Sequence, residues 1–280
     1  MPQRRPSFGE SANDVANLLD VHPKIAAGVW NEIKLFLELG IPTTLLNVSF
    51  SLSPLLTASY VGLKFGKVYL SAFTLANLTG NLCTFSLMSG MFSAADTLAP
   101  QAFGRGDYRE LGLLAIRGVA AATIIILPIN VLLVLYLEAV FVAMGQDPEA
   151  AYHAAQWYRI FVWALPFFVI FNVIWKFLSA QHVMRPLIYV SMFCCIVILP
   201  IALELCTESM GFLGSAVAYV IFQAFQPILL LWYLHRVQPH VQGSWPGLAV
   251  WREALCWEPL MEYLHLGAGG VLAQSEWIYW

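Results

Sequence analysis

The sequence predicts an all-α membrane protein with six complete transmembrane helices and the start of a seventh. Of its 280 residues, 59% are hydrophobic and only 11% are charged. A soluble domain usually carries charge on roughly a quarter of its residues, so the apolar excess must face a bilayer. The apolar runs are also longer than the roughly ten-residue alternating strands of an outer-membrane barrel, which favours helices over strands.

Seven apolar runs follow one another along the chain. Runs of about 18 or more such residues are long enough to cross the hydrocarbon core as a helix. The predicted spans are 39–63, 68–95, 118–137, 160–175 (in a helix expected to begin near residue 151), 186–203, 209–234 and 263–280. The density of prolines in or beside these spans predicts bent helices around a cavity. They are Pro42, Pro54, Pro128, Pro166, Pro200 and Pro227.

The chain is expected to divide into four parts. They are a polar, flexible cytosolic tail (1–33), a six-helix bundle (34–236), a cytosolic linker (237–256) and the beginning of a second bundle (257–280). Lys and Arg favour the cytosolic side of a membrane. Placing the N-terminus in the cytosol leaves only Lys64, Lys67 and Arg159 of the 14 basic residues on the other side.

A weak internal repeat supports the start of a second bundle. The pattern of residues 30–40 recurs at 257–267, and the same register then aligns Asn47 with Gln274. The last apolar run still continues at Trp280. A helix that stops within hydrocarbon leaves its last carbonyls unsatisfied, so the chain is expected to be truncated inside its seventh helix.

A compact polar and Gly-rich segment, 96–112, separates the second and third spans. The distribution of basic residues places it in the cytosol, where we expect a short loop. Asp96 is expected to bond backbone amides of this loop. Gln101 lies in the same segment and is assigned to the same loop. Gly104 is assigned to it too, because glycine suits a tight turn.

Glu276 is the most prominent candidate for chemistry. It lies roughly 13 residues into the last span and therefore near mid-bilayer, at about 1.5 Å of rise per residue. An ionised carboxylate at that depth costs at least about 2.5–3.5 kcal/mol, which favours binding a proton near neutral pH. The alternatives are a Glu that is hydrogen-bonded between helices, or one in a chain end that never spans the membrane.

Asparagines inside two of the spans are candidates for a polar cavity. Asn47 lies in the first predicted span and Asn81 in the second. Polar groups of this kind often hydrogen-bond across membrane helices, so a purely structural role stays open for both.

Several classes of function are disfavoured. The net charge of −3 argues against a nucleic-acid partner. The five cysteines lack the spacing of a metal site, and neither a Walker motif nor a G-x-S-x-G motif is found. We therefore expect neither an enzyme nor a cofactor-dependent protein.

At this point the residues resemble a known family. The sequence 81–104 reads Asn81-x3-Phe85-Ser86-Leu87-x-Ser89-Gly90-x2-Ser93-Ala94-x-Asp96-Thr97-Leu98-x2-Gln101-Ala102-Phe103-Gly104. It is similar to the end of the second helix and the following loop of multidrug and toxic compound extrusion (MATE) transporters of the eukaryotic type. Shorter similarities follow in order at 145–148, 177–181 and 211–216. Glu276-Trp277-x-Tyr279 resembles the acidic-aromatic motif of the family's seventh helix.

The resemblance implies a fold and an activity. It implies twelve helices in two six-helix lobes, of which this chain supplies the first lobe and part of the seventh helix. It also implies a secondary antiporter that exports organic cations, xenobiotics or amphipathic metabolites in exchange for protons, or for sodium in some members. Glu276 would bind the proton and the cation, Trp277 and Tyr279 would line the cavity, and Asn81 would be a polar residue of the cleft. Gln274 and Asn47 are assigned to the same cavity.

Two alternative functions remain open, and so does the choice between two membranes. A related flippase for lipid-linked solutes would require a large cationic cavity. A non-transporting half would regulate a full-length partner. In either case the chain would be a multi-pass protein of the plasma or vacuolar membrane, and as a transporter it would need a C-terminal lobe in cis.

Overall fold

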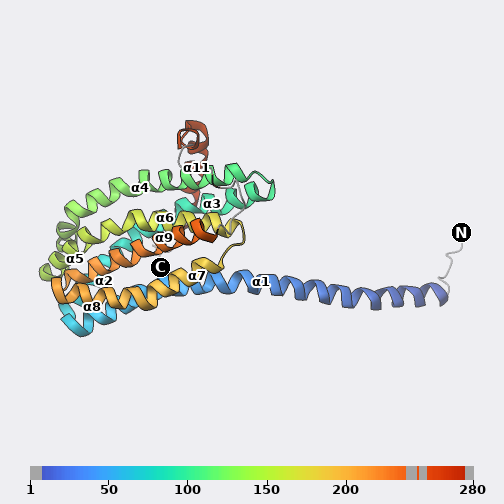
Figure 1. Ribbon diagram of the computed structural model, residues 1–280, viewed down its shortest axis with the longest axis horizontal. Coiled ribbons are helices and arrows are strands. Elements are labelled where there is room, and N and C mark those ends of the chain that lie inside the picture. Colours follow the sequence, from blue (N-terminus) through green and yellow to red (C-terminus); the bar gives the residue numbers. More distant parts are fainter. Residues whose placement is uncertain (1–7, 238–244, 246–250, 275–280) are drawn as a thin grey trace. The chain divides into compact units, whose positions relative to one another are not determined.

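The structure is a computed structural model that describes residues 8–237, 245 and 251–274. The chain forms two compact units, 1–45 and 46–280. In the first unit the described residues belong to helix α1 (Phe8–Phe65), so the tail expected to be flexible is helical from Phe8 onward. The second unit contains the rest of α1 and every later helix (Figure 1).

Four helices of the described residues are long and apolar enough to cross a membrane. They cover Tyr108–Ala143, Pro148–Ala180, Arg185–Met210 and Leu213–Val237, with mean hydropathies between 1.6 and 2.5. The predicted third to sixth spans fall within these four helices, apart from the first few residues of the sixth. The first two predicted spans lie in long helices that are less apolar, so the count of six complete spans stays a prediction.

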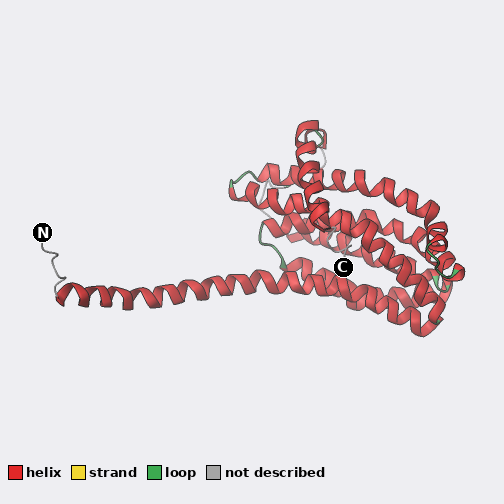
Figure 2. Cartoon of the chain, turned by 180° about the vertical axis from the view of Figure 1, so that it is seen from behind, coloured by secondary structure: helices red, strands yellow, loops and turns green. Residues whose placement is uncertain are grey.

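Two of these four spans contain an irregular turn. The third is the single helix α4 (Tyr108–Ala143). The fourth consists of α5 (Pro148–Phe161), the 3₁₀ turn η2 (Val162–Ala164) and α6 (Leu165–Ala180). The fifth consists of α7 (Arg185–Phe193), the π-turn η3 (Cys194–Ile198) and α8 (Leu199–Met210), and the sixth is α9 (Leu213–Val237). Figures 1 and 2 show α4, α6 and α9 running alongside one another.

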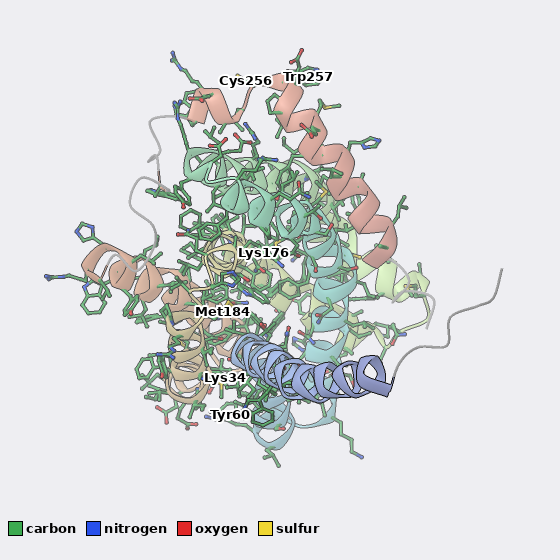
Figure 3. The ribbon with its side chains drawn as sticks, turned by 90° about the vertical axis from the view of Figure 1, so that its right-hand side faces the viewer. Lys34, Tyr60, Lys176, Met184, Cys256 and Trp257 are labelled. Carbon is green, nitrogen blue, oxygen red and sulfur yellow. The ribbon has the colours of Figure 1, made fainter. Side chains whose placement is uncertain are left out.

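The second predicted span belongs to a continuous helical stretch. It consists of α2 (Lys67–Gly80), the π-turn η1 (Asn81–Phe85) and α3 (Ser86–Gly104). Two further helices follow the sixth span. They are α10 (Trp251–Ala254), which lies in the predicted linker, and α11 (Trp257–Gln274). Trp257, where α11 begins, is labelled in Figure 3.

Small side chains let the helices of the second unit approach closely. Helix α2 packs against α5, and Ala72, Ala76, Ala151 and Ala154 are buried in these two helices. Such small residues are typical of membrane helix contacts, where close packing replaces the hydrophobic effect. The core is completed by aromatic rings such as Trp157, whose indole N–H donates to Ser215 Oγ at 3.0 Å.

The fifth span extends further than the sequence suggested. Helix α8 continues to Met210, so Ser209 lies in the last turn of this span and does not begin the sixth. The hydroxyl groups of the last turn bond their own helix, since Thr207 Oγ1 donates to the Leu203 carbonyl at 2.7 Å and Ser209 Oγ donates to the Cys206 carbonyl at 3.1 Å. The helix ends at Gly211, whose φ of 62° and ψ of −141° are accessible essentially only to glycine.

The contact between α8 and α9 depends on Gly214. A Cβ atom at this position would overlap the backbone carbonyl of Cys206, and the short turn after α8 gives the two helices little freedom to separate. We expect Gly214→Ala to lower the free energy of unfolding by about 1–3 kcal/mol, as for other overpacked cores. Thermal unfolding in detergent would measure this. Gly104→Ala is the matched control, because a Cβ there meets no described atom within 4 Å.

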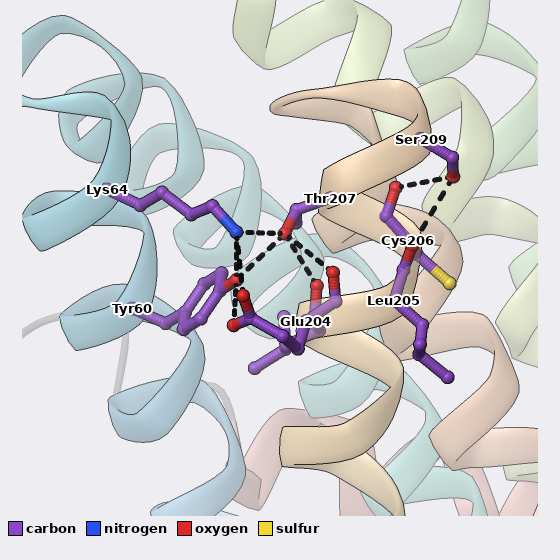
Figure 4. A network of polar contacts seen from close by, with 8 residues as sticks. Tyr60, Lys64, Glu204, Leu205, Cys206, Thr207 and Ser209 are labelled. Carbon is purple, nitrogen blue, oxygen red and sulfur yellow. Dashed lines mark hydrogen bonds and ion pairs between the residues drawn. The ribbon is translucent and has the colours of Figure 1, made fainter.

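A polar network joins the ends of α1 and α8 (Figure 4). Lys64 Nζ lies 3.2 Å from Glu204 Oε1 and donates to the Tyr60 hydroxyl at 2.6 Å. The Tyr60 hydroxyl in turn donates to Glu204 Oε2 at 2.6 Å and contacts Thr207 Oγ1 at 2.9 Å. The Lys64 and Glu204 side chains are 34% and 55% exposed, so the pair itself stabilises the fold only slightly. Its main effect is to fix the end of α1 beside α8.

Candidate functional site

A groove opens between the second half of α1 and helix α2. It has a volume of about 480 Å³, which is in the range of small-molecule sites. Polar and aromatic side chains share its surface with aliphatic ones. The lining residues are Phe50, Ser51, Pro54, Leu55, Ala58, Phe73, Thr74, Asn77 and Asn81.

Helical spacing explains why these residues meet. On α1 the lining residues Ser51, Pro54, Leu55 and Ala58 recur three and four positions apart, which places them on one face of the helix. Asn47 is exposed and precedes Ser51 by one turn on the same face. The face of α1 that carries Asn47 is therefore the face that lines the groove.

Asn81 lies in the groove at the point where α2 becomes the π-turn η1. Its side chain is exposed, and its Nδ2 donates to the Asn77 carbonyl at 2.9 Å. Asn81 is thus part of the lining of the groove. The location agrees with a cavity residue, although contact with a solute stays a prediction.

The residues assigned from the seventh helix cannot be placed in the same way. Glu276, Trp277 and Tyr279 lie outside the described residues. Gln274 is the last residue of α11. Their assignment to a cavity therefore rests on the sequence alone.

The loop predicted at 96–112 is much shorter in the structure. Asp96 and Gln101 lie inside α3, and Gly104 is its last residue. The helix continues because Ala95, Ala99 and Ala102 recur at helical spacing and are buried, despite Pro100 within it. The connection to α4 is only 105–107.

Asp96 does not cap a loop but forms an ion pair. Its carboxylate lies 2.7 Å from Lys176 Nζ on α6, and Lys176 is labelled in the middle of Figure 3. Lys176 is one of the eleven basic residues that the predicted orientation places on the cytosolic side. A lysine at the end of an apolar run was the available signal for an acidic partner. The sequence does not show which one, because Asp96 is 80 residues away from Lys176.

A buried polar cluster was also missed. Thr84, Asn130 and Tyr158 come from η1, α4 and α5 and are at most 2% exposed. Thr84 Oγ1 and the Tyr158 hydroxyl both donate to Asn130 Oδ1, at 3.1 and 2.8 Å. The signal was Asn130 itself, which is a polar residue inside the charge-free run 118–137.

Arg117 fastens α10 to α4. This arginine is 6% exposed. Its Nε donates to the Ala254 carbonyl at 3.1 Å and its Nη1 pairs with Glu110. A second pair joins Arg109 to Glu253 at 2.7 Å. The part of the linker nearest α11 is thus held against α4.

Comparisons with known proteins agree with this architecture. The MatE family model matches residues 42–203. The uncharacterized transporter C323.07c of Schizosaccharomyces pombe is 31% identical, over 88% of this chain and 46% of its own length. Multidrug and toxin extrusion protein 1 of Xenopus tropicalis is 27% identical, over 89% of this chain and 42% of its own.

The solved structures show the same fold. The eukaryotic MATE transporter AtDTX14 superposes with a TM-score of 0.74 at 21% identity, over 88% of this chain and 53% of AtDTX14. This chain therefore spans about half the length of the relatives it matches, and its helices form half of a MATE fold. Since the family model covers more than half of the chain, this integral membrane protein belongs to the MATE family of eukaryotic type.

Proposed function

We propose that this chain forms the N-terminal half of a secondary antiporter that exports organic cations or amphipathic solutes. The coupling ion is the proton, with sodium as the alternative. A second six-helix lobe in cis completes the pathway, in the plasma or vacuolar membrane, with the N-terminus in the cytosol. Membership of the MATE family supports this proposal, and several relatives are named as multidrug and toxin extrusion proteins.

The composition of the α1–α2 groove carries the proposal. The partly exposed ring of Phe50 lines the groove, and aromatic rings attract organic cations. Asn77 and Asn81 supply amide groups that can orient a solute by hydrogen bonds. The residues that line the described groove are uncharged, which supports a cationic or neutral solute over the anionic headgroup that a lipid-linked flippase would carry.

Ethidium efflux provides a test of this groove. In the protein expressed from its full coding sequence, Asn81→Ala should raise the KM for ethidium about 2- to 10-fold, the value of one lost hydrogen bond. The amount of protein in the membrane should stay unchanged, because the Asn81 amide bonds only its own helix among the contacts described.

Asn172→Ala is the matched control for this variant. Asn172 Nδ2 also donates to the carbonyl four residues earlier, at 2.9 Å, but Asn172 is buried on α6 away from the groove. An equal change in KM for both variants, or no change for Asn81→Ala, would contradict a solute contact in this groove.

A further inference from the structure

The π-turn η1 separates two side chains that an α-helix would place together. Residues three apart lie on the same face of an α-helix, yet Asn81 is exposed in the groove and Thr84 is fully buried. Within η1 the Ser86 N–H bonds the Asn81 carbonyl five residues back. A π-turn thus adds one residue to a helical turn and inserts about 100° of rotation. Asn81 can therefore face α1 while Thr84 faces α4 and α5.

The buried side of this turn is held by hydrogen bonds to one oxygen atom. Thr84 Oγ1 and the Tyr158 hydroxyl converge on Asn130 Oδ1, and these two hydroxyls lie 3.2 Å apart. Asn130 Nδ2 donates to the Ile126 carbonyl at 2.8 Å, which fixes the orientation of the amide. Because the cluster is buried, a lost partner would leave a polar group unsatisfied, and that is costly.

Packing reinforces the same side of the turn at both ends. The ring of Phe161 on α5 lies so close to Gly80 that a Cβ there would be 3.1 Å from Cε1. The same ring contacts Phe85 edge-on, with centroids 5.8 Å apart. The residues immediately before and at the end of η1 thus contact one aromatic side chain, so Phe161 of α5 packs at both ends of the turn.

We propose that Thr84, Asn130 and Tyr158 are positioning residues that hold the π-turn and thereby orient Asn81 into the groove. The three side chains act through the helix backbone and do not reach the groove themselves. The importance of this orientation for transport rests on the proposed function, but the orientation itself does not.

Cysteine accessibility measures the orientation directly. The Asn81→Cys substitution is introduced after the five native cysteines have been replaced by alanine. A charged methanethiosulfonate reagent then modifies position 81 in membranes. Adding Thr84→Val should slow this modification at least fivefold, because relaxation of the π-turn rotates residue 81 out of the groove. Thr84→Ser, which keeps the hydroxyl, should restore the original rate.

Thr79→Val is the matched control. Thr79 is a buried threonine of the same helical stretch, but among the contacts described its hydroxyl donates only to the Leu75 carbonyl of its own helix, at 2.9 Å. A modification rate in Thr84→Val that equals or exceeds the rate in Thr79→Val would overturn the proposal.

A second variant covers the case in which Thr84→Val fails to fold. Tyr158→Phe keeps the buried ring and removes one of the two donors to Asn130, and it should slow modification at least twofold. An unchanged rate would again overturn the proposal. Labelling needs no transport, so a failure of Asn81→Ala to alter ethidium efflux would contradict the proposed function and leave this result unaffected.

Discussion

Replacing Glu276 with glutamine should abolish efflux driven by a pH gradient while leaving the protein in the membrane. Glutamine has the shape of glutamate but cannot exchange a proton. The predicted position of Glu276 near mid-bilayer would cost an ionised carboxylate at least about 2.5–3.5 kcal/mol, so we expect Glu276 to bind a proton and the variant to remove that step. Efflux of ethidium from proteoliposomes with an imposed pH gradient, using the full-length protein, measures the effect.

Glu262→Gln serves as the control for this experiment. Glu262 is an exposed residue in the first part of α11, and its substitution should leave efflux near the original rate. Full activity of Glu276→Gln under a pH gradient would remove Glu276 from the mechanism. Loss of proton-driven efflux with retained sodium-driven efflux would instead show that the residue serves proton coupling alone.

Arg117→Met should destabilise the protein by about 1.5–3 kcal/mol, the value of hydrogen bonds to a charged group. Methionine retains much of the length of the side chain but loses the bonds to Glu110 and to the Ala254 carbonyl. The loss is large because Arg117 is 6% exposed and water cannot readily replace these bonds. Thermal unfolding of the purified protein in detergent would measure it.

Arg109→Met provides the comparison. Arg109 pairs with Glu253 in the same linker region, but its side chain is 62% exposed. Exposed pairs contribute at most about 1 kcal/mol, and added salt should weaken the Arg109 pair further. Equal destabilisation by the two substitutions would mean that burial of Arg117 does not strengthen its contacts.

The strength of the hydropathy signal explains which of the predicted spans are supported by helices of membrane length and composition. The third to sixth spans are apolar enough to be recognised from composition alone, and the four membrane-length helices confirm them. The first two are less apolar because serine, threonine and asparagine interrupt them. Some of these residues, such as Ser51, Thr74 and Asn81, line the groove. The polar residues that line the groove thus lower the hydropathy from which a membrane-spanning helix is predicted.

The error at Asp96 has a related cause. Charge and glycine at 96–106 indicated a loop, whereas burial of Ala95, Ala99 and Ala102 extends the helix. An amphipathic helix end and a polar loop have similar composition. They differ in the periodicity of small apolar residues, and alanine is too weakly hydrophobic to make that periodicity obvious.

The sequence by itself determined the family, the helical character and the approximate position of most spans, because these depend on local composition and on motifs read in order. Only the tertiary structure decided which polar residues meet. Asp96 pairs with Lys176, and Thr84 meets Asn130 and Tyr158, across separations of 46 to 80 residues. Such contacts depend on which helix faces oppose each other, and a single π-turn changes that by about 100°.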